Sequence, residues 1–184
     1  MPARSLIVVA LLLAPAAALA QTSPYAGQET RTIKALSAED VDGLLQGKGM
    51  ALAKAAELNG YPGPPHALDL AAELALSPEQ IATLKDIQAR MTAAAKPLGA
   101  AIVEAERALD RRFAERRIDR ESLAEATAGI GKLWGELRAV HLAAHLETRA
   151  ALSGEQIARY DALRGYTGNA EQHPGHGHHG KHGG

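Results

Sequence analysis

The chain has 184 residues, of which 46% are hydrophobic, 22% are charged and only 3% are aromatic, and its formal net charge is −1. One Trp, one Phe and four Tyr cannot fill the thick core of a sandwich or of a doubly wound sheet. The abundant residue is alanine, the strongest helix former, so the composition predicts a thin all-α protein. The absence of cysteine excludes disulfides, thiolate metal sites and cysteine nucleophiles. The near-neutral charge provides no electrostatic footprint for nucleic acid.

Residues 1–20 have the pattern of a Sec-type signal peptide. Arg4 supplies the positive charge, residues 6–13 form an apolar stretch, and Ala18-Leu19-Ala20 is a small-residue cleavage site. The apolar stretch is too short to span a membrane. We therefore expect cleavage after Ala20, and an exported mature chain without a membrane span.

Residues 167–184 end in a run of glycine and histidine, which we expect to be a disordered tail because it contains nothing apolar to bury. Clustered imidazoles can bind zinc, copper or nickel. The alternative is a solvated tail that is rich in histidine without a metal role. The candidate ligands are His173, His176, His178, His179 and His182.

The body begins after residues 21–36, a polar stretch that we interpret as a disordered lead-in. Ser37, with an acid three residues later, is a helix N-cap, and the helix is expected to run to about Leu58. Residues 59–65 hold three prolines and two glycines and predict an extended break. A short helix over about residues 66–74 follows.

A long arm is predicted over residues 78–117. Ser77 and Gln80 form a capping box with a proline at the first helical position. Pro97 is expected to kink the arm, because it removes one backbone hydrogen bond and clashes with the preceding turn. The arm's apolar stripe has the alternating spacing of three and four that one helix face requires: Leu84, Ile87, Met91, Ala94, Leu98, Ile102, Ala105, Leu109 and Phe113.

A returning helix begins after a predicted cap at Asp119, and a last helix runs from a cap at Ser153 to about Arg164. The returning stripe matches that of the first arm, so the two pack as a long antiparallel helical hairpin flanked by short helices. Two helices leave much of each apolar face uncovered, which favours a homodimer. The returning stripe is Leu123, Thr127, Ile130, Trp134, Leu137, His141, Ala144, Thr148 and Ala151.

One element occurs twice, as Leu76-Ser77-Pro78-Glu79-Gln80 and as Leu152-Ser153-Gly154-Glu155-Gln156. With the signal peptide, this pair resembles the L-T-x-x-Q motif family of periplasmic stress proteins, to which Spy, CpxP, ZraP and CnrX belong. Serine replaces the usual threonine in both copies, and either hydroxyl can cap a helix. The resemblance covers residues 37–166.

This resemblance implies a periplasmic protein whose helical hairpin dimerises into a concave cradle. Spy-like members are ATP-independent chaperones, CpxP-like members also dampen an envelope stress kinase, and ZraP- and CnrX-like members bind divalent metals. Unfolded client proteins or an envelope signalling protein are therefore the expected partners.

His141 and His145 are one helical turn apart, a spacing that lets two neutral imidazoles bind one divalent ion. The alternative is structural, because His141 also belongs to the packing stripe. Candidates for further ligands are Glu147, His66 or a residue of a partner chain. A zinc protease would need a glutamate where Leu142 stands, so hydrolysis is not expected.

Residues 104–121 contain as many bases as acids and are interpreted as the solvated tip of the hairpin, with client contact as the alternative. Tyr160 and Tyr166 are predicted to pack the end of the last helix onto the bundle, and Trp134 is predicted to lie in the core.

The preferred hypothesis is a Spy/CpxP-like chaperone that also binds a transition metal (zinc, copper or nickel). The alternative is a metal-sensing regulator of a membrane-anchored signalling partner. We expect no enzymatic activity and no organic cofactor, because the sequence carries no nucleophile elbow and its residues 43–49 fail the phosphate-loop pattern.

Overall fold

The computed structural model describes residues 23–166. Of these, residues 23–30 and residues 31–166 belong to separate units, and the second unit carries the helices. All regular elements within residues 23–166 are helical, which agrees with the predicted all-α class. They are α1 (Ala38–Gln46), α2 (Lys54–Glu57), α3 (Pro64–Asp69), α4 (Pro78–Ala114), α5 (Arg120–Ala151) and α6 (Gly154–Leu163).

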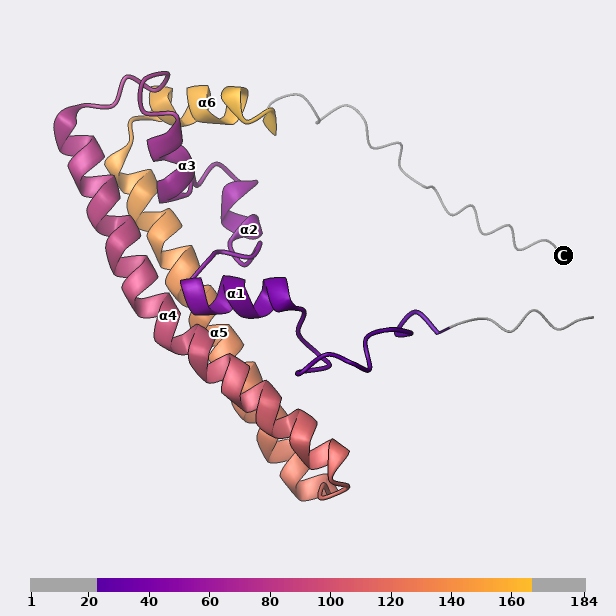
Figure 1. Cartoon of the computed structure of the whole chain (residues 1–184). Helices are drawn as coiled ribbons and strands as arrows, with labels where there is room; N and C mark the ends of the chain where they lie inside the picture. Colours follow the sequence, from indigo (N-terminus) through magenta and orange to yellow (C-terminus); the bar gives the residue numbers. More distant parts are fainter. Residues whose placement is uncertain (1–22, 167–184) are drawn as a thin grey trace, which may run out of the picture. The chain divides into compact units, whose positions relative to one another are not determined.

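The long antiparallel pair of α4 and α5 forms the backbone of the fold (Figure 1). Capping boxes start both helices, with Ser77 accepting from the backbone of Gln80 and Asp119 accepting from that of Ser122. Each box satisfies backbone N–H groups that no helical carbonyl can reach. The predicted caps and the hairpin are thus confirmed, and α4 runs unbroken through Pro97.

The short helices cover one side of this hairpin, with α3 and α6 near its base and α1 farther along, while the tip extends beyond α1 (Figure 1). They divide the core into two clusters. One surrounds Leu84, Leu74 and Tyr160 near the base. The other surrounds Leu44, Ile102 and Leu137, where α1 crosses α4, and Trp134 packs against it as predicted.

The two copies of the repeated element meet at the base of the hairpin. Gln80 Nε2 donates to Gln156 Oε1 at 2.9 Å, and Gln156 Nε2 donates to Gln80 Oε1 at 3.0 Å. Each amide also donates to a backbone carbonyl, Gln80 to Ala151 and Gln156 to Leu74. The glutamines therefore cap their own helices and join the starts of α4 and α6 to each other.

The predicted first helix is too long. α1 ends at Gln46, where Gly47 takes a left-handed conformation with φ of 70°, and a loop separates α1 from the four-residue α2. Glycine takes this conformation without steric cost, so it ends the helix despite the apolar residues beyond it. The extended break predicted over residues 59–65 and the short helix predicted over about residues 66–74 also differ from the structure. The helix there, α3, begins at Pro64 and ends at Asp69.

The predicted lead-in is wrong at its C-terminal end. Ile33 and Leu36 are buried in the cluster around Leu44. The interpretation of residues 21–36 as disordered weighed their polar composition and overlooked these two apolar residues, three apart, which fit one side of a turn.

None of the helices in residues 23–166 is both long enough and apolar enough to cross a bilayer.

We predict that Gly99→Ala destabilises the fold by about 1–3 kcal/mol, because overpacking at a tight contact displaces one element from another. A Cβ atom at Gly99 would lie 2.0 Å from the backbone oxygen of Leu44 in α1. The measurement is urea unfolding followed by the fluorescence of Trp134.

The matched control is Gly129→Ala in α5, where a Cβ atom meets nothing within 4 Å. This change should stabilise the protein by up to about 1 kcal/mol through helix propensity. Equal effects of the two substitutions would contradict the close packing of α1 on α4.

Candidate functional site

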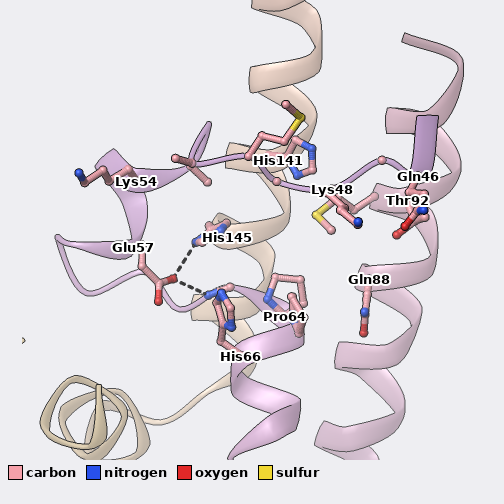
Figure 2. Close-up of a pocket in the computed structure, with 18 residues that line it drawn as sticks. Gln46, Lys48, Lys54, Glu57, Pro64, His66, Gln88, Thr92, His141 and His145 are labelled. Atoms are coloured by element: carbon pink, nitrogen blue, oxygen red, sulfur yellow. Dashed lines mark hydrogen bonds and ion pairs between the residues drawn. The ribbon is translucent and has the colours of Figure 1, made fainter. Parts of the chain in front are cut away.

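A pocket of about 510 Å³ opens beside the middle of the hairpin. Its walls come from the loop after α1, from α2, from the start of α3 and from the facing sides of α4 and α5 (Figure 2). It borders both core clusters, since Met50 packs against one and Met91 against the other, and both line the pocket.

His141 and His145 both line this pocket from α5 (Figure 2). Their exposed fractions are 2% and 9%, although histidine side chains are more often partly exposed. His145 Nδ1 lies 2.7 Å from the backbone oxygen of Tyr61. A carbonyl oxygen only accepts, so Nδ1 carries a proton and Nε2 is the nitrogen of His145 that could bind a metal.

The space around the His145 ring depends on Gly63. A Cβ atom there would lie 3.0 Å from His145 Cε1 and 3.1 Å from Nε2. These contacts are tighter than side chains normally make, so glycine lets the start of α3 approach the ring. The imidazole is therefore fixed by a hydrogen bond at one nitrogen and by backbone packing beside the other.

His141 has a buried Nε2 atom with no hydrogen-bond partner within residues 23–166. Burial lowers the pKa of His141, and the nearby His145 lowers it further. The ring is therefore held neutral, the state in which an imidazole can bind a metal. Two imidazoles, one oriented by a carbonyl and one unpartnered, meet the first requirement of a metal site.

The further ligands predicted from the sequence separate in the structure. His66 lines the same pocket from α3. Glu147 does not, and instead pairs with Arg90 at 2.6 Å. Within residues 23–166 no group of three His, Cys, Asp or Glu side chains is placed to hold a metal. Of the ligands predicted from the sequence, His66, His141 and His145 line the pocket.

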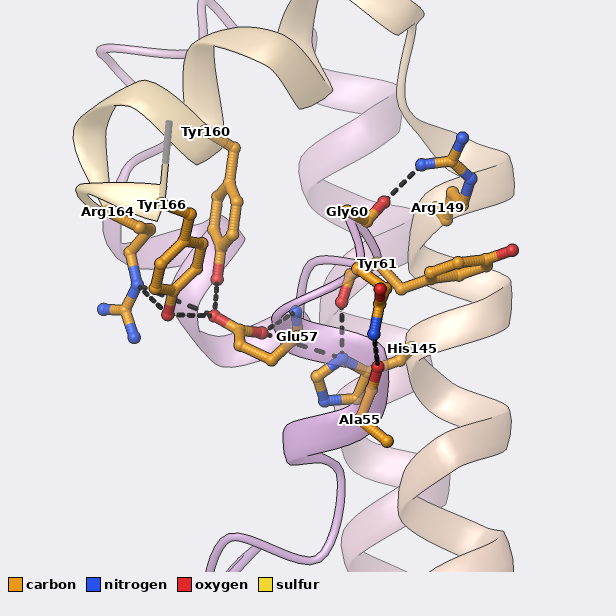
Figure 3. Close-up of polar contacts among 11 residues, drawn as sticks. Ala55, Glu57, Gly60, Tyr61, His145, Arg149, Tyr160, Arg164 and Tyr166 are labelled. Atoms are coloured by element: carbon orange, nitrogen blue, oxygen red, sulfur yellow. Dashed lines mark hydrogen bonds and ion pairs between the residues drawn. The ribbon is translucent and has the colours of Figure 1, made fainter. Parts of the chain in front are cut away.

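Glu57 is the functional residue that the sequence analysis missed. It lines the pocket from α2, and its carboxylate accepts hydrogen bonds from the hydroxyls of Tyr160 and Tyr166 and from the backbone N–H of Gly63 (Figure 3). Arg164 lies 3.6 Å from the same carboxylate. No sequence spacing links a residue of α2 to partners more than one hundred positions later.

This network attaches the end of α6 to the wall of the pocket. Burial raises the pKa of Tyr160, and its hydrogen bond to Glu57 raises it further, so the hydroxyl remains a donor. The predicted packing of Tyr160 and Tyr166 onto the bundle is confirmed, and Glu57 is the group that they contact.

Comparison with known families gives a match for the profile described as the LTXXQ motif family, over residues 65–164, which is more than half of the chain. The chain belongs to the LTXXQ motif family. No curated protein and no solved structure matches it.

In this LTXXQ family protein both motif copies lie within the matched region, and their glutamines make the reciprocal contact at the base of the hairpin. The motif therefore acts on the scaffold and does not enter the pocket. The predicted tail ligands His173, His176, His178, His179 and His182, like the predicted signal peptide, lie outside the described residues.

The predicted solvated tip carries short-range ion pairs, such as Arg107 with Glu104 and Arg117 with Glu115. Two large apolar side chains are nevertheless exposed there, Phe113 at 55% and Leu123 at 37%. The stripe that is buried farther down the hairpin thus reaches the surface at its tip.

We predict that Tyr160→Phe lowers the free energy of unfolding by about 1–3 kcal/mol, because the buried carboxylate of Glu57 loses a hydrogen-bond donor. Tyr61→Phe is the matched control, since the Tyr61 hydroxyl makes no hydrogen bond within residues 23–166. Chemical denaturation measures the free energy of unfolding of both variants. Equal stability of the two would show that Glu57 does not hold α6.

Proposed function

We propose that this protein is a periplasmic, ATP-independent chaperone of the LTXXQ family that also binds a transition metal. The observation that carries the metal part is the pair of buried imidazoles in one pocket, in which Nε2 of His141 has no hydrogen-bond partner within residues 23–166. Family membership and the predicted signal peptide over residues 1–20 support the periplasmic location.

The chaperone part rests on the tip of the hairpin. Phe113 and Leu123 offer apolar surface to an unfolded segment, and the ion pairs around them keep the surface hydrated. In such binding, exposed apolar groups of the tip contact apolar groups of the client at equilibrium. It needs neither a nucleotide nor a catalytic residue. We propose unfolded clients as the partners, with no enzymatic activity, no organic cofactor and no nucleic acid.

The working form is proposed to be a homodimer. Apolar side chains are exposed along the helices as well as at the tip, among them Leu45 of α1 and Leu146 of α5. A second copy would remove part of this surface from water, and a concave face between two hairpins would leave the tips available to clients.

The metal is proposed to bind at His141 and His145, with the histidines of the tail as a second, less ordered site. Zinc, copper and nickel are all compatible with imidazole ligands. The alternative of a metal-sensing regulator shares this site and differs in its partner. Metal binding is therefore expected for both, and suppression of aggregation separates them.

We predict that the mature chain with all five tail histidines changed to alanine keeps one equivalent of bound metal in equilibrium dialysis. That equivalent of metal should be lost in the further variant His141→Ala/His145→Ala, because this variant removes both imidazoles that we assign to the site. His66→Ala tests separately whether the third imidazole of the lining is a further ligand. Retention of metal after loss of the pair would refute the assignment.

We predict that the mature protein suppresses aggregation of an unfolding client without ATP, at equimolar ratio or below. Phe113→Ser/Leu123→Ser should weaken this suppression several-fold, because it removes the apolar surface of the tip. Leu163→Ser is the matched control, as Leu163 is 46% exposed but lies at the end of α6, away from the tip. Light scattering during client unfolding measures the effect. No suppression at several-fold excess would remove the chaperone proposal.

A further inference from the structure

Sulfur atoms are concentrated in the pocket that holds the two buried histidines. The chain contains three methionines, and the two that follow Met1 are Met50 and Met91. Both line this pocket, Met50 from the loop after α1 and Met91 from α4, and the imidazoles of His141 and His145 face the same space from α5 (Figure 2). Two thioethers and two imidazoles from three different segments thus converge on one cavity.

Core filling alone is an incomplete explanation for this placement. Methionine commonly fills irregular gaps between other apolar side chains. Here each methionine packs against a core cluster and also borders a cavity of about 510 Å³ that His141 and His145 line too.

The backbone at Met50 is strained. Met50 and Ala51 have φ of 43° and 62°, a left-handed conformation that is unfavourable for a residue with a side chain. The Met50 side chain also needs Gly43, because a Cβ atom there would lie 2.9 Å from the Met50 sulfur. Two local constraints therefore fix Met50 against α1 at the edge of the pocket.

The charged side chains of the lining are either paired or cationic, and His66 is a third imidazole that lines the pocket. The Glu57 carboxylate already accepts hydrogen bonds from Tyr160, Tyr166 and Gly63. The two lysines in the lining, Lys48 and Lys54, bring positive charge to it, although Lys48 is paired with Asp42 at 2.8 Å. The thioethers of Met50 and Met91 are the soft donors of the lining.

This donor set fits one kind of ion best. Zinc sites in proteins usually have four ligands, or three and a water, drawn from histidine, cysteine and carboxylates, and no such group of three is arranged within residues 23–166. Thioethers select cuprous copper among the common ions, and imidazole suits it as well. A single positive charge is also less costly than a double one beside Lys48 and Lys54, and the carboxylate of Glu57 lies 3.7 Å from His145 Nδ1.

We propose that this pocket binds one cuprous ion through His141 and His145 together with the thioethers of Met50 and Met91, in preference to zinc. The proposal rests on the metal site assigned under the proposed function and names its preferred ion. No change of oxidation state is involved, since the ion is bound as Cu(I).

The test uses the full mature chain with the five tail histidines changed to alanine, under anaerobic conditions. Cu(I) affinity is measured by competition with bicinchoninate, and Zn²⁺ affinity by competition with a chromophoric zinc chelator. In Met50→Leu/Met91→Leu, a substitution that keeps the side-chain volume, Cu(I) should bind at least about tenfold more weakly while Zn²⁺ binding is unchanged. In His141→Ala/His145→Ala, both ions should be lost.

X-ray absorption at the copper edge supplies a second readout, because sulfur scattering should be present in the parent and absent from the leucine variant. Unfolding in urea checks that the leucine variant is folded. Stoichiometric zinc binding that needs the histidines, with no Cu(I) preference and no effect of the leucines, would overturn this inference and leave the metal site standing. Failure of both ions to bind the parent would overturn the site and the inference together.

Discussion

The hairpin of α4 and α5 can by itself bury only the narrow stripe of side chains between its two helices. The other segments of the fold cover the apolar side chains that this pair leaves exposed. Residues 31–76 supply that cover on one side, through Ile33 and Leu36, α1 and α3. The contact is close where α1 crosses at Gly99, which has no room for a Cβ atom. Because the covering segments are short, they bury the stripe in two clusters and leave the pocket along the boundary of both.

The scaffold was largely predictable because its signals are local. A capping box is formed by side chains and backbone within one helical turn, so Ser37, Ser77, Asp119 and Ser153 could be recognised from a few neighbouring residues. The stripes of α4 and α5 are periodic over many turns, which predicts a hairpin even at low aromatic content. The end of α1 was missed because apolar residues continue on both sides of Gly47. Whether the helix ends at this glycine or continues through it depends on packing against α4.

The site was predictable only where its residues share a helix. His141 and His145 are one turn apart, and that spacing places both in the same pocket once α5 forms. Glu57, Gly63 and Met50 reach the same place from other segments, and their contacts depend on how residues 47–65 fold over the hairpin. Neither spacing nor composition encodes that arrangement. The same reasoning explains Glu147, which shares the helix with the histidines but points to Arg90 on α4.

Several features of the pocket are unfavourable for the free energy of folding, and the packing of the hairpin requires none of them. A buried imidazole nitrogen without a partner costs about 1–3 kcal/mol, and a leucine at the His141 position would avoid that cost while continuing the apolar stripe. The backbone of Met50 is strained, and residue 63 must be glycine because a side chain there would crowd the ring of His145. A structural role for His141 would explain its burial but not the unpartnered nitrogen. A bound soft ion would satisfy that nitrogen and give ligand roles to Nε2 of His145 and to the thioether of Met50.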